Sequence, residues 1–231
     1  SLLDRARAAT SGWRDDFRGL LRDPNQQALI LYACVQPLRF SCFATAVVLH
    51  MTDVMDAGPQ FVGIMFTLMA LGQGLATPFG STVADRMTSG TARTGLVVPA
   101  MLGAQAAFGS LAFLTDPNGV YLAVAVMGGC SGMAASAVGA FSAEVTPMDK
   151  RGQALSLQRQ AGSSLTLVSP IALGLLADVT SRPVAIVATS SLMAACTLGY
   201  WLLARRATAT AAGARDVLGG GVSEQDDSPA R

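Results

Sequence analysis

Two arginines lie inside long apolar stretches of this sequence, where a charged side chain is costly. Arg39 is near the middle of the stretch 28–50, and Arg159 is about 10 Å inside the stretch 152–177 at the rise of an α-helix. A guanidinium at the centre of a bilayer costs roughly 2.5–3.5 kcal/mol on insertion scales. It also offers two-pronged, charge-assisted hydrogen bonds that suit a carboxylate. Arg39 therefore needs water, a counter-charge or a solute beside it, whereas Arg159 can alternatively snorkel to the membrane surface.

Further polar residues share a helix face with each arginine, because residues three or four apart lie on one side of a helix. The two faces carry Tyr32, Gln36, Arg39 and Phe43 in the first stretch, and Arg159, Gly162, Thr166 and Ser169 in the other. Pro37 and Pro170 are predicted to break their helices, which would free the carbonyls of Ala33 and Thr166. We expect the faces to line a wet cavity, where the residues predicted to contact a solute are Tyr32, Gln36, Arg39, Gln158 and Arg159.

No aspartate or glutamate lies well inside any apolar stretch. The counter-charge for the arginines must therefore come from another segment, from backbone carbonyls and water, or from an anionic solute. Gln73 and Gln105 are expected to join helices through interhelical hydrogen bonds, and Gly128 and Gly132 to allow close helix packing.

The sequence gives little indication of catalysis. The segment 129–132 reads Gly-Cys-Ser-Gly and resembles the nucleophile position of rhomboid intramembrane proteases. A serine nucleophile needs a positioned base, however, and the single histidine, His50, ends a different apolar stretch. The four cysteines show no paired spacing. We expect no enzyme activity, no metal site and no cofactor.

The composition is that of an integral membrane protein. Of the 231 residues, 51% are hydrophobic and 13% are charged, whereas soluble domains carry about 25% charged residues. We predict an all-α, polytopic membrane protein with an amphipathic lead-in (1–27), a six-span transmembrane unit (28–204) and a disordered tail (205–231). The six predicted spans are residues 28–50, 60–80, 94–114, 120–143, 152–177 and 183–204.

The basic residues alternate from loop to loop. Five precede the first span, two follow the second, two follow the fourth and four follow the sixth, whereas the other loops contain only Arg182. Since basic loops stay in the cytoplasm, we expect both termini to be cytoplasmic, in a membrane that the sequence does not identify. The net charge of +1 and the absence of a basic stripe argue against a nucleic-acid partner.

Three segments resemble the major facilitator superfamily. They are residues 81–86 (STVADR), residues 147–152 (PMDKRG) and residues 169–178 (SPIALGLLAD). In that family the loop after the second span reads approximately G-x-L-A-D-R-x-G-R-R, which Asp85 and Arg86 match, with the next basic residue at Arg93. The resemblance covers about residues 12–206 and implies a gating role for this loop.

The resemblance also implies a fold and a function. Family members carry twelve spans in two halves, and each half contains two inverted repeats of three helices, with a solute site between the halves. The chain is similar to the C-terminal half, so its expected partners are a lipid bilayer, a small-molecule solute and a missing N-terminal six-span half. We expect transport of a small organic solute, with an anionic one as a candidate, by alternating access. A proton-coupled multidrug exporter half and a non-transporting six-span scaffold are the alternatives.

Overall fold

The computed structural model describes residues 19–87 and 90–219, and within them the side chains of residues 19–87 and 94–207. Every regular element in these ranges is a helix, which confirms the predicted all-α class. Five helical segments are long and apolar enough to cross a bilayer: Pro24–Met55, Pro59–Arg86, Pro117–Val145, Met148–Val179 and Arg182–Ala207. The third predicted span corresponds to α5 (Gly90–Ser110), which is not among the five found in the described residues.

The first span is a continuous helix built from α2 (Pro24–Cys42), the π-helix η1 (Phe43–Val47) and α3 (Val48–Met55). Asp23 caps its start, because the carboxylate accepts a hydrogen bond from the backbone N–H of Asn25 at 2.9 Å and Pro24 suits the first turn. The span ends at Asp56, whose φ of 51° lies in the left-handed region. It is therefore longer at both ends than the predicted stretch 28–50.

The two prolines that were predicted to break helices do not do so. Pro37 lies inside α2 and Pro170 lies inside α7, and both helices continue through them. A proline removes one N–H donor, but neighbouring helices can hold the chain in helical form at such a position in a membrane. The irregular part of the first span begins about two turns beyond Pro37, where η1 has the wider hydrogen-bonding pattern of a π-helix.

The remaining helices differ from the predicted spans mainly at their ends. They are α4 (Pro59–Arg86), α5 (Gly90–Ser110), α6 (Pro117–Val145), the short 3-10 helix η2 (Met148–Lys150), α7 (Arg151–Val179) and α8 (Arg182–Gly219). Hydropathy marks only the apolar part of a helix, whereas caps decide where the helix begins. Asp116 caps α6, for example, by accepting from the backbone N–H of Gly119 at 2.8 Å. Since α8 continues to Gly219, no helix end marks the expected border between span and tail at residue 204.

Most of the predicted lead-in lies outside the described residues. Its last part includes Leu20, which is buried against Ala154 and Leu157 at the start of α7. This contact places the chain before α2 beside the first turns of α7.

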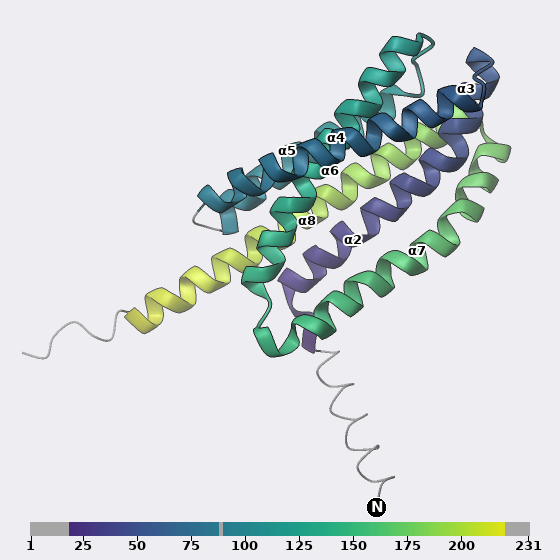
Figure 1. Ribbon diagram of the computed structural model, residues 1–231. Coiled ribbons are helices and arrows are strands. Elements are labelled where there is room, and N and C mark those ends of the chain that lie inside the picture. Colours follow the sequence, from purple (N-terminus) through teal and green to yellow (C-terminus); the bar gives the residue numbers. More distant parts are fainter. Residues whose placement is uncertain (1–18, 88–89, 220–231) are drawn as a thin grey trace, which may run out of the picture.

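The helices pack in a single order along the bundle. α4 packs on α6, α6 on α5, α5 on α8, α8 on α2, and α2 on α7. Figure 1 shows α7 at one edge, beside α2, and α8 running the length of the bundle and projecting beyond it. The helices that end this order, α4 and α7, are the least buried of the five apolar segments. Each therefore presents a long face that no other described helix covers.

Glycines bring α4 and α6 close together. A Cβ added at Gly128 would lie 3.1 Å from Met69 Cα, and one added at Gly132 would lie 3.1 Å from Gln73 Cα, with the carbonyl oxygens closer still. Only glycine allows the two backbones to approach this far. The predicted close packing at Gly128 and Gly132 is confirmed.

Side-chain hydrogen bonds join two other pairs of helices. Gln105 Nε2 of α5 donates to Thr197 Oγ1 of α8 at 2.7 Å and to Met193 O at 3.1 Å. Ser169 Oγ of α7 donates to Ser41 Oγ of α2 at 2.7 Å, and both residues are buried. The interhelical role predicted for Gln105 is confirmed.

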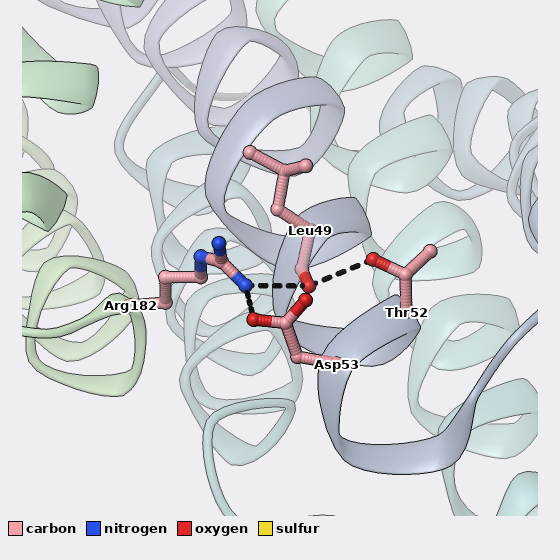
Figure 2. Close-up of polar contacts among 4 residues, drawn as sticks. All are labelled: Leu49, Thr52, Asp53 and Arg182. Atoms are coloured by element: carbon pink, nitrogen blue, oxygen red, sulfur yellow. Dashed lines mark hydrogen bonds and ion pairs between the residues drawn. The ribbon is translucent and has the colours of Figure 1, made fainter.

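An ion pair at one end of the bundle connects α3 to α8. Arg182, at the start of α8, pairs with Asp53 and donates to Leu49 O at 3.0 Å. Thr52 Oγ1 donates to the same carbonyl at 2.9 Å, so three side chains meet at the last turns of α3 (Figure 2). Asp53 and Arg182, which were expected in loops on one side of the membrane, do lie at the same end.

Candidate functional site

A cavity of about 670 Å³ lies between α2, α6 and α7. Residues Thr146 and Arg151 line it where α6 ends and α7 begins, and Tyr32 and Thr166 line it deeper in the bundle. Its volume falls within the roughly 300–1,000 Å³ typical of small-molecule sites. Three of the five residues predicted to contact a solute line this cavity, namely Tyr32, Gln158 and Arg159.

The cavity lining carries positive charge and no negative charge. Arg159 and Arg151 both contribute to it, and no aspartate or glutamate does. Arg151 Nη2 donates to Ala143 O at 2.6 Å, so this arginine also satisfies a carbonyl near the end of α6. Gln158 Nε2 is buried, and no described residue accepts its hydrogen bonds. An acceptor-rich, negatively charged molecule complements this arrangement.

A hydrogen-bonded chain leads from this cavity to Arg39. Arg39 Nη2 donates to Gln36 Oε1, and Gln36 Nε2 donates to the hydroxyl oxygen of Tyr32 at 3.3 Å. A guanidinium has donors only, so the oxygen of Gln36 must face Arg39 and its NH₂ must face Tyr32. The Tyr32 hydroxyl hydrogen consequently remains available to a molecule in the large cavity.

Arg39 itself faces a second, much smaller cavity of about 60 Å³. Its side chain is buried, with the residue 8% exposed, and no carboxylate among the described residues pairs with it. Gln73, which was expected to join helices, is instead exposed at this cavity. The residues that line it are Gln36, Arg39, Phe40, Phe43, Met69, Gln73 and Ser131.

The polar face of α7 contacts α2 as well as the cavity. A Cβ added at Gly162 would lie 3.2 Å from Ala33 O, the carbonyl that loses its helical partner at Pro37. The missing side chain therefore allows α7 to approach this carbonyl. Thr166 Oγ1 donates to Gly162 O within α7 at 3.1 Å. The polar face thus serves helix packing at one part and the cavity at another.

The residues predicted to form a gating loop lie mainly in helices. Asp85 and Arg86 are exposed in the last turn of α4, which continues six residues beyond the predicted end at residue 80. Arg93 falls in the first turn of α5, and its side chain lies outside the described residues. A carboxylate at this end of a helix opposes the helix dipole, as expected from the sequence.

Sequence reasoning missed two features of the large cavity. Arg151 was expected only as one of the two basic residues between the fourth and fifth spans, although it begins α7 and lines the cavity. Thr146, which lies between the same two predicted spans, accepts a hydrogen bond from the buried Gln26 Nε2 at 2.9 Å and thereby connects the start of α2 to the end of α6. A signal was available for Arg151, because it lies eight residues before Arg159 and hence close to the same helix face.

Ser131, the serine of the segment that resembles a protease nucleophile, lies inside a helix. Ser131 is buried in α6, and its hydroxyl donates to Met127 O of the same helix at 2.5 Å. His50 lies in α3 and does not line the cavity that Ser131 lines.

A family model described as the Major Facilitator Superfamily matches residues 29–220 of the 231. The chain therefore belongs to the major facilitator superfamily, and with its apolar helices it is a multi-pass membrane protein. This match confirms the resemblance seen in the sequence, and members of this family are membrane transporters rather than enzymes. No protein with curated annotation matches the chain.

Proposed function

We propose that this chain is one half of a transporter that binds a small organic anion in the cavity of about 670 Å³ and carries it across a membrane by alternating access. The observation that supports the proposal most strongly is the lining of this cavity, which has two arginines and no carboxylate. Arg159 is exposed and Arg151 is partly exposed in the described chain. Positive charge that no carboxylate in the lining balances favours an anion over a neutral or cationic molecule of the same shape.

The residues around the cavity divide into direct and indirect contacts. Arg159, Gln158 and Tyr32 present hydrogen-bond donors to the solute, and Arg159 contributes the paired N–H groups that suit a carboxylate. Gln36 and Arg39 contribute indirectly, because their hydrogen bonds orient the Tyr32 hydroxyl toward the solute.

We infer that the unit has six spans arranged as two inverted repeats, with α5 as the third span. In this arrangement α2 corresponds to α6, α4 to α7 and α5 to α8. The helices pack in the order α4–α6–α5–α8–α2–α7, and replacing each helix by its counterpart gives the same order read backwards. Residues 23–25 and 116–118 both read Asp-Pro-Asn, and they begin α2 and α6. Pro78 and Pro170 are each the twentieth residue of their helices, α4 and α7.

The alternating cycle requires a second six-span unit, which we place against the exposed faces of α4 and α7. These faces carry large apolar side chains, including Leu75, Phe79, Leu167 and Ile171. By the loop charges, both termini are cytoplasmic, and the large cavity then opens toward the cytoplasm. In this orientation Asp85, Arg86 and Arg93 lie on the cytoplasmic side. There we assign them a gating role at the connection between α4 and α5.

The substrate class is tested with matched solutes in proteoliposomes that contain the complete transporter. The three solutes of a set share one carbon skeleton, and they differ only in carrying a carboxylate, an amide or an amine. We expect saturable uptake of the carboxylate and at least tenfold slower uptake of its amide and amine counterparts. Equal uptake of all three would refute an anion site.

Two alternatives give different results in the same assay. A proton-coupled multidrug exporter would prefer the amines and require a pH gradient. A six-span scaffold would transport none of the solutes and would tolerate loss of Arg39.

A further inference from the structure

The cavity at Arg39 is too small for the organic solute proposed for the large cavity. Its volume of about 60 Å³ is less than a tenth of the volume of the large cavity, which is about 670 Å³. The size of this cavity therefore favours a small inorganic ion, with or without water beside it, over an organic solute.

The charge at this cavity is not balanced by the described chain. Arg39 donates to Gln36 Oε1, which is a neutral acceptor that already belongs to the chain leading to Tyr32. A neutral amide dipole cannot cancel a full positive charge in a region of low dielectric constant. The guanidinium has five N–H groups, so donors remain for a second acceptor.

The other walls suit a small anion better than a cation. Gln73, at the edge of the cavity, has no hydrogen bond from its side-chain amide to another described residue, so its NH₂ can donate to a ligand. Phe43 and Met69 form an apolar wall, which strengthens the attraction of a nearby charge because it excludes water. No carboxylate that would attract a metal cation lines the cavity.

We propose that this cavity is a binding site for a monovalent anion of the size of chloride, held by the Arg39 guanidinium and the Gln73 amide. The site is separate from the large cavity and does not depend on the substrate proposed for it. The bound ion offsets the cost of burying Arg39.

The experiment measures thermal unfolding of the full chain in lipid nanodiscs without any organic solute. Sodium chloride replaces sodium methanesulfonate at constant ionic strength, so that screening of surface charges is unchanged. A ligand that binds only the folded state raises the unfolding temperature as its concentration passes the dissociation constant. We expect such a rise for wild type and for the matched control Arg159→Gln, and no rise for Arg39→Gln.

A second variant covers the case in which Arg39→Gln does not fold. Gln73→Leu removes one donor at the exposed edge of the site, and loss of one charge-assisted hydrogen bond should raise the half-saturating chloride concentration about tenfold. The proposal is overturned if wild type shows no chloride response, as it would if water or a carboxylate from another unit neutralised Arg39. It is also overturned if Arg39→Gln retains the full response, or if Gln73→Leu leaves the half-saturating concentration unchanged.

Discussion

The glycine contacts between α4 and α6 allow a quantitative prediction about stability. An added Cβ at Gly132 would lie 3.1 Å from both Cα and the carbonyl carbon of Gln73, and nearer still to its oxygen. Backbone atoms cannot swing aside as the end of a flexible side chain can, so the two helices must move apart. Overpacking of this kind typically costs about 1–3 kcal/mol. We therefore expect Gly132→Ala to lower the free energy of unfolding by about that amount.

The same helix supplies the control for this experiment. The nearest atom to a Cβ at Gly129 is Gly72 O at 3.9 Å, which is an ordinary contact. Gly129→Ala should therefore be neutral, or more stable by up to about 1 kcal/mol through the higher helix propensity of alanine. The free energy of unfolding is measured by titrating SDS into mixed micelles and following tryptophan fluorescence. Equal stabilities of Gly132→Ala and Gly129→Ala would refute the close packing of α4 on α6.

Three further predictions concern Arg39, the orientation in the membrane and the ion pair at Arg182. In the complete transporter, Arg39→Lys should weaken transport strongly at nearly unchanged abundance, because lysine lacks the planar fork that holds Gln36 in the chain to Tyr32. Without chloride, Arg39→Leu removes the burial cost and should leave the protein at least as stable. Equal uptake rates for wild type and Arg39→Lys would show that Arg39 has only a structural role. Single cysteines at Asp53, Asp116 and Asp178 should react with an impermeant reagent from outside; reaction only after the cytoplasmic side is opened would reverse the orientation. Arg182→Gln should lower the free energy of unfolding by less than about 1 kcal/mol, since the side chains of Arg182 and Asp53 are 34% and 60% exposed, and a larger loss in thermal unfolding would contradict this weak role.

The sequence was sufficient to predict the features that depend on composition and helical spacing. Tyr32, Gln36 and Arg39 do form a connected chain on one face of α2, because their spacing alone brings them together. Gly128 and Gly132 do lie at a close helix contact, since small residues four apart leave a groove on one side of a helix.

Other features depend on tertiary packing and could not be predicted from the sequence. The polar faces that carry Arg39 and Arg159 were expected to line one wet cavity, yet the two arginines line different cavities, because the cavities are enclosed by side chains from α4, α6 and α7. The prolines were expected to break their helices, but local propensity does not include the support that neighbouring helices provide. Arg151 was missed because the predicted fifth span began at residue 152, whereas α7 begins at Arg151 and includes it in the cavity lining.

The most direct test of the central claim is whether Arg159 makes the large cavity select for negative charge. The measurement is the ratio of uptake efficiencies for a carboxylate solute and its neutral amide counterpart, in wild type and in Arg159→Gln proteoliposomes of the complete transporter. If Arg159 binds the carboxylate with two hydrogen bonds, Arg159→Gln should reduce this ratio at least tenfold, chiefly by slowing uptake of the carboxylate. An unchanged ratio would contradict the assignment of the cavity between α2, α6 and α7 as an anion site.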